Sequence, residues 1–161
     1  SVSFTSGIDS TYKTYIFKSI RIHPSDSGVE WTFQANVSGA SGYNETILST
    51  YFRGYYTESG STDHFGYQAP FDQSGTAFQP INPGIGNQAD AVGDGELWIF
   101  NPSSTTYVKH FHNRSSQMGS SPAARDSFTA GFFNVTGAIT EVQFKMASGT
   151  FDGVISMYGL G

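Results

Sequence analysis

Cysteine is absent from the 161-residue chain, and charged residues make up only 13% of it. The absence of cysteine excludes disulfide scaffolds and thiolate metal sites. The charged fraction is well below the value of about 25% that is typical of globular proteins, which suits a subunit that packs against copies of itself or other proteins. No apolar run approaches the roughly 18 residues that a membrane-spanning helix needs.

Basic residues are also scarce: the chain has eight Lys and Arg and a net charge of −5. They are scattered, so no basic stripe is available to neutralise phosphates, which argues against nucleic-acid binding. Aromatic residues, in contrast, reach 16% and glycine counts 19. This composition favours short strands joined by tight turns, and the length fits one domain over residues 1–161.

The clearest strand is predicted at Val29–Val37, where apolar residues at odd positions alternate with polar residues at even positions. This period of two predicts that the odd face lies in the core and the even face in solvent. The preceding segment, Tyr12–His23, is rich in β-branched and aromatic residues, and we expect three isoleucines to share one face: Ile16, Ile20 and Ile22. Turn residues at 24–28 predict that the two segments form an antiparallel hairpin.

Further strands are predicted at 47–56, 65–68, 96–100, 105–113, 128–134, 140–146 and 153–158. Between them lie a polar loop over Ser115–Pro122 and a long irregular loop region over 57–95, which contains three of the six prolines. With eight or nine strands and no amphipathic helix, the sequence predicts an all-β fold. The architecture that fits is an antiparallel two-sheet sandwich of the jelly-roll type.

Three stretches carry a resemblance to a known family: Ser6–Pro24, Gly95–Pro102 with Tyr107–Lys109, and Val142–Gly159. They resemble the compact β-domains of virion structural proteins in tailed phages, especially phages of marine bacteria and cyanobacteria. The ending, in which two strands flank a short glycine turn and finish in Tyr158-Gly159, is the most recurrent piece.

The resemblance implies a virion protein, either a capsid decoration protein or a head or tail fibre or its tip. It also implies a homo-oligomer, a trimer above all, in contact with other virion proteins such as capsid or tail. It carries over no catalytic residue and no cofactor. The chain lacks heptads and a repetitive shaft, so a complete protein of this length fits a decoration or appendage subunit, whereas a fragment fits a fibre tip equally well.

Two groups of residues are weak candidates for metal binding. His110 and His112 are two positions apart on a predicted strand, which places both on one face, and His64 would have to supply a third ligand. The acidic cluster Asp90, Asp94 and Glu96 lies among glycines and offers oxygen ligands of the kind that calcium prefers. Its spacing does not match a calcium loop. We favour solvent-facing or interface histidines and a solvated acidic loop.

Carbohydrate binding is the alternative function, because sugar sites on sandwiches combine aromatic rings with a few polar side chains. The sequence offers such a set in and beside the 57–95 region: Arg53, Tyr55, Tyr56, Asp63, His64, Phe65 and Tyr67. A host surface glycan would be the partner. The competing interpretation, that these aromatics cover the core or an oligomer interface, is the one we favour.

No catalytic motif occurs in the chain: a nucleophile elbow, a zinc-protease helix motif, a phosphate loop and a cysteine nucleophile are all missing. The sequence therefore predicts a protein that is not an enzyme. Two hypotheses remain, namely a structural protein on a virion surface that acts by symmetric assembly and a glycan-binding recognition domain.

Overall fold

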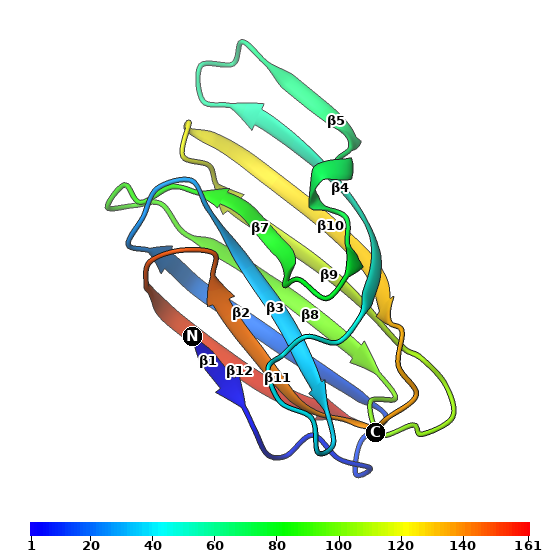
Figure 1. Cartoon of the computed structure of the whole chain (residues 1–161). Coiled ribbons are helices and arrows are strands. Elements are labelled where there is room, and N and C mark those ends of the chain that lie inside the picture. The colour runs from blue at the N-terminus through cyan, green and yellow to red at the C-terminus, as the bar shows by residue number, and fades with distance from the viewer.

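The computed structural model describes all residues, 1–161, and confirms the predicted all-β sandwich of two antiparallel sheets (Figure 1). One sheet has four strands in the order β1-β11-β3-β7, and the other has eight, ordered β12-β2-β8-β9-β10-β4-β5 with β6 also paired to β4. The twelve strands exceed the predicted eight or nine. Their bounds are β1 Val2–Phe4, β2 Thr14–Pro24, β3 Val29–Val37, β4 Ile47–Thr57, β5 Asp63–Tyr67, β6 Ser74–Gly75, β7 Gln79–Ile85, β8 Gly93–Phe100, β9 Lys109–Met118, β10 Ala123–Phe133, β11 Ile139–Met146 and β12 Phe151–Leu160.

The strands pair in nested order: β2 with β12, β3 with β11, and β4 with β10. Such nesting is how a jelly roll folds one long antiparallel ribbon into two sheets. The predicted hairpin of β2 and β3 is wrong, because the two strands belong to different sheets. The turn between them bridges the sheets: the Ser25 N–H donates to Thr150 beside β12, and the Gly28 N–H donates to Ile85 of β7.

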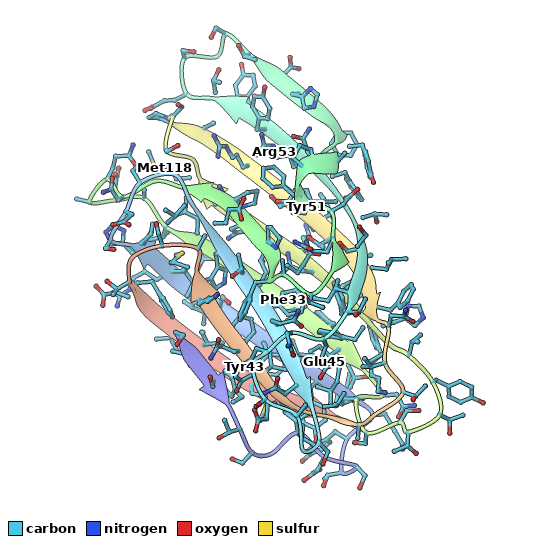
Figure 2. All side chains as sticks on the ribbon, viewed as in Figure 1. Phe33, Tyr43, Glu45, Tyr51, Arg53 and Met118 are labelled. Carbon is cyan, nitrogen blue, oxygen red and sulfur yellow. The ribbon has the colours of Figure 1, made fainter.

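A single cluster of 18 buried residues, seven of them aromatic, fills the space between the sheets. Phe33 of β3 lies at its centre (Figure 2), with its ring centroid 5.1 Å from that of Phe111 on the large sheet and 6.4 Å from that of Phe144 on the small one. Trp31 stacks on Phe144 at 5.7 Å. Because each such side chain buries a large apolar area, truncating one to alanine costs about 3–5 kcal/mol.

The face assignment within β2 differs from the prediction. Tyr15 and Phe17 are buried, whereas Ile20 is exposed and Ile22 is buried. A β-bulge between Ser19 and Ile22 inserts an extra residue on β2 and reverses the alternation there. Ile20 and Ile22 therefore face opposite sides of the sheet.

The even positions of β3 were predicted to face solvent, and this is also wrong, since Thr32, Gln34 and Asn36 are buried. Loops close over this outer side of the small sheet. The Gln34 Nε2 donates to the carbonyls of Glu45 and Thr76, at 2.9 and 3.2 Å. Because these loops satisfy its polar side chains, β3 is buried on both faces.

The 57–95 region is not one irregular loop. It holds β5, β6, β7, the start of β8 and the 3-10 helix η1 (Ala69–Phe71). The prolines misled the prediction, because Pro80 and Pro83 lie in β7, the edge strand of the small sheet, where a missing N–H is tolerated. The structure has no helix with the length and apolarity to cross a membrane.

The predicted polar loop at 115–122 is strand as far as Met118, since β9 runs from Lys109 to Met118. Its polar residues face inward and bind carbonyls of β7: the Ser115 hydroxyl donates to Ile81 at 3.1 Å, and the Gln117 amide donates to Pro83 at 2.8 Å. Tyr51 of β4 also donates to Ile81. The inner polar face of β9 therefore holds the two sheets together beside β7.

Candidate functional site

The outer face of the eight-stranded sheet is the side turned away from the small sheet, and it gathers most of the exposed apolar surface. Side chains alternate along each strand, so the residues next to buried positions point to this outer face. The structure has twelve exposed large hydrophobic residues. Nine of them lie on this face: Ile20, Leu48, Phe52, Tyr56, Phe65, Tyr67, Val154, Tyr158 and Leu160. They form two groups at opposite ends of the sheet, one on β4 and β5 and the other on β2 and β12. Clustered exposed apolar residues of this kind are typical of interaction surfaces.

A shallow depression of about 880 Å³ lies in the middle of this face, over β4, β8, β9 and β10. Small residues form its floor where the strands pair: Gly54 opposes Asp126, and Ser116 opposes both Asp126 and Asp94. Tyr56 and Trp98 are the large aromatic residues along it. We call this depression, lined by Gly54, Tyr56, Asp94, Glu96, Trp98, His112, Arg114, Ser116, Ala124 and Asp126, the trough.

Two ion pairs involve three of the four charged side chains of the trough, and the fourth, Asp94, accepts the Arg21 backbone N–H. Lys18 lies 3.1 Å from Glu96, and Arg114 reaches both carboxylate oxygens of Asp126, with Nη2 2.9 Å from Oδ2. The hydrogen bond from Lys18, followed by that from the Trp98 indole, lowers the pKa of Glu96. The trough thus presents ionised groups in fixed positions.

Aromatic rings line up beside these charges. The Trp98 ring stacks on that of His112 at 5.7 Å across β8 and β9. The Arg114 guanidinium lies over the Phe128 ring at 5.2 Å, and Phe128 stacks on Phe52 at 4.8 Å with the planes 7° apart. The result is a row of π faces and charged groups that runs across four strands.

The two candidate metal groups do not assemble. His110 and His112 both lie on the outer face of β9, but their rings contact Phe132 and Trp98, and His64 lies on β5. Asp94 accepts the Arg21 N–H at 2.7 Å, and Glu96 pairs with Lys18. No three His, Asp or Glu side chains gather in an arrangement that could hold a metal ion, and Asp90 joins no such group.

The residues predicted for carbohydrate binding lie on the β4–β5 hairpin, which reaches past the small sheet (Figure 1). The strand alternation divides them between two faces. Tyr56, Asp63, Phe65 and Tyr67 belong to the outer face, whereas Arg53, Tyr55 and His64 belong to the opposite one. The predicted residues therefore cannot all contact one ligand, because they lie on two opposite faces of the hairpin.

On that opposite face the Arg53 guanidinium lies 5.6 Å from the Tyr55 ring and 5.5 Å from the Phe71 ring. Tyr55 in turn lies beside His64 at 5.5 Å. On this face, therefore, the aromatic rings contact Arg53 and one another.

Trp98, Arg114 and Asp126 were not predicted from the sequence as members of one site. A signal for four of the trough residues exists in the alternation of two strands. Glu96 and Trp98 flank the buried Leu97, and His112 and Arg114 flank the buried Asn113. Only the β8–β9 register brings Glu96 opposite Arg114 and Trp98 opposite His112.

No family model, curated protein or solved structure matches this chain.

Proposed function

We propose that this domain is a non-enzymatic structural protein of a tailed-phage virion surface and that its working surface is the outer face of the eight-stranded sheet. The observation that carries the proposal is the concentration of nine of the twelve exposed large hydrophobic residues on that single face. Exposed apolar surface costs solubility and is therefore usually covered by a partner. A particle-bound subunit has such partners at hand.

The resemblance to phage virion proteins supports the same location. The stretches that carry it build β2, β8, β11 and β12, and three of these strands, β12, β2 and β8, are neighbours in the large sheet. The resemblance thus falls on strands that contribute to the proposed working surface.

The chemistry of the face favours binding over catalysis. Glu96 and Asp126, the carboxylates nearest the aromatic row, are each engaged by a cation. A general acid needs a raised pKa, and the environment of Glu96 lowers its pKa. These contacts support a trough that holds a partner over one that transfers a proton.

The test is to purify particles of the phage that encodes the chain and to identify their proteins by mass spectrometry, with antibody labelling of intact particles. We expect the chain in the particles at a regular copy number and accessible to antibody. Detection in the infected-cell lysate but never in particles would contradict the proposal.

Carbohydrate binding is the second candidate, and the trough is the observation that favours it. Its combination of aromatic rings, ion-paired charges and a floor of small residues suits a sugar, which presents both an apolar face and hydroxyl groups. Because Lys18 and Arg114 are already paired with carboxylates, they are not free to bind an acidic group, and the trough suits a neutral glycan better than an acidic one.

Retention of the protein on neutral glycans and on host cells tests this second candidate. Arg114→Ala and Trp98→Leu should each reduce retention of the protein at least tenfold. Lys13→Ala changes an exposed residue outside the trough and should leave retention unchanged. If the wild-type protein is not retained, or if the three variants behave alike, the trough is not a sugar site.

A further inference from the structure

A sheet edge exposes unpaired N–H and C=O groups, and natural proteins protect such edges from pairing with another chain. The sandwich has four edge strands: β1 and β7 on the small sheet, and β5 and β12 on the large one. Three of these are protected, each in a different way, and the fourth is not.

The protection of β1, β5 and β7 against pairing has clear physical causes. β1 has only three residues, and β5 has five, with Asp63 and His64 among them. β7 contains Pro80 and Pro83, and side chains from the large sheet bind its carbonyls, as when Tyr51 and Ser115 donate to Ile81. Short length, charge, proline and capped carbonyls are all recognised means of blocking an edge.

β12 has none of these protections. It has ten residues, it contains no proline, and its single charged residue, Asp152, lies near its start. It pairs only with β2, so its other side is open. Eight consecutive uncharged residues, from Gly153 to Leu160, therefore lie along an edge that could accept another strand.

The hydrogen bonds show which backbone groups face this edge. The Asn101 N–H donates to the Lys13 carbonyl, so Lys13 directs its backbone groups toward β8. Direction alternates along a strand, and the next residues of β2 at even positions therefore direct theirs toward β12. Their partners are Leu160, Tyr158, Ser156 and Val154. The backbone groups left free at the edge are those of Ile155, Met157 and Gly159.

These features point to a second copy of the chain as the partner. We propose that β12 pairs in antiparallel fashion with β12 of another molecule across a two-fold axis at Ser156, joining two eight-stranded sheets into one. In this register Ile155 and Met157 of opposite molecules exchange their free N–H and C=O groups. A strand that meets its own copy must be self-complementary, and this one places no like charges opposite each other.

The side chains of the outer face support the same register. Val154 lies opposite Tyr158 of the second copy, an aromatic and β-branched pair of the kind that stabilises sheets. The exposed residues Ile20, Val154, Tyr158 and Leu160 of both copies then form one apolar surface across the axis. This pairing does not depend on the location of the protein in a particle or on sugar binding.

The oligomeric state in solution tests the proposal first. Analytical ultracentrifugation at tens of micromolar should give twice the 17.4 kDa mass of one chain. Ser156→Lys places two like charges at the axis and should yield the monomer, as should Ser156→Glu, whereas Ser156→Thr should remain a dimer. An equimolar mixture of the Lys and Glu variants should recover the dimer, because opposite charges then meet.

The lack of cysteine in the chain allows a second, independent test. Residues opposite each other in a non-hydrogen-bonded antiparallel pair have Cα atoms about 4.5 Å apart, within the range of a disulfide. Ser156→Cys should therefore form a covalent dimer on mild oxidation, and Ser61→Cys, in the exposed β4–β5 turn, should not. A monomeric or trimeric wild type would overturn the proposal. A dimer that tolerates Ser156→Lys and does not cross-link at position 156 would overturn it as well.

Discussion

Arg114 of β9 and Asp126 of β10 are diagonal neighbours, Arg114 lying opposite Phe128, and they form a two-armed ion pair, with Arg114 Nε 3.3 Å from Oδ1 and Nη2 2.9 Å from Oδ2. The pair is solvent-exposed, since 70% of the Arg114 side-chain surface and 39% of that of Asp126 is accessible. The ion pair therefore matters for orientation more than for stability: it holds the Arg114 guanidinium over the Phe128 ring, beside the floor of the trough.

Asp126→Ala should separate stability from binding. Exposed ion pairs contribute only about 0–1 kcal/mol to stability, so the melting temperature should fall by a few degrees at most. Retention on a glycan that binds the wild type should fall clearly, because Arg114 is no longer held in one orientation. A large loss of stability, measured by thermal unfolding, would show that the pair has a structural role.

Gly131→Ala should destabilise the sandwich, because a Cβ at this position would lie 2.3 Å from the Leu48 carbonyl oxygen and 2.9 Å from the Phe111 ring. Overpacking of this kind costs about 1–3 kcal/mol. Gly75→Ala is the matched control, since nothing lies within 4 Å of the added Cβ. Urea unfolding of the two variants measures the difference, and equal stabilities would show that β10 and β4 can move apart at little cost.

Glu30→Gln should stabilise the protein at neutral pH. Burial raises the pKa of Glu30 above its ordinary value of 4.5. A carboxyl group whose pKa is raised by folding favours the folded state when protonated, and this contribution is lost as the pH rises through the folded-state pKa. The free energy of unfolding of Glu30→Gln should therefore exceed that of the wild type at pH 7 and converge with it in acid.

Glu58→Gln, at an exposed position of the β4–β5 turn, is the control for this pH series. It should show no such pH-dependent gain. If both variants gain equally, the gain reflects net charge and not the burial of Glu30.

Tyr51→Phe should change the alkaline limit of stability. Burial raises the pKa of Tyr51 above its ordinary value of 10.0. Below pH 10 the phenol is neutral in both states, but above it the unfolded chain loses the proton while the folded chain retains it, so stability falls. The phenylalanine variant should not show this alkaline loss of stability. At neutral pH its free energy of unfolding should be lower by about 0.5–1.5 kcal/mol, because the hydrogen bond to the Ile81 carbonyl is missing.

Chemical unfolding on both sides of pH 10 measures the effect of Tyr51→Phe, and Tyr107→Phe, at an exposed position, is the control. An alkaline stability profile of Tyr51→Phe that parallels the wild type would show that Tyr51 ionises equally in both states.

The sequence was sufficient where one strand carried a strong alternating pattern. The bounds predicted for β3, Val29–Val37, are those observed, and the strands predicted at 47–56 and 140–146 match β4 and β11 to within one residue. The same reasoning failed for β7, because its prolines indicate a loop unless the strand is known to lie at an edge. It failed for the second half of β9, because polar residues that bind carbonyls inside the sandwich have the composition of a loop.

For the candidate site too, the sequence predicted some features and the strand register decided others. Alternation placed His110 and His112 on one face, and composition indicated that exposed aromatics would take part in contacts. Neither could show that Glu96 lies opposite Arg114, since that depends on the register of β8 and β9. Nor could they show that Asp63, Phe65 and Tyr67 share a face with Tyr56, since that depends on the pairing of β5 with β4.

The chain's own residues determined the class of the fold, because strand formation depends on local periodicity, turn chemistry and aromatic content. The partner of each strand was decided only by tertiary structure, because the turn at 24–28 can serve a hairpin or a crossover equally well. The bulge at Ser19–Ile22 and the protected and open edges were decided at the same level. An edge exists only once all the other strands have found their neighbours, and for that reason the open side of β12 cannot be read from its ten residues.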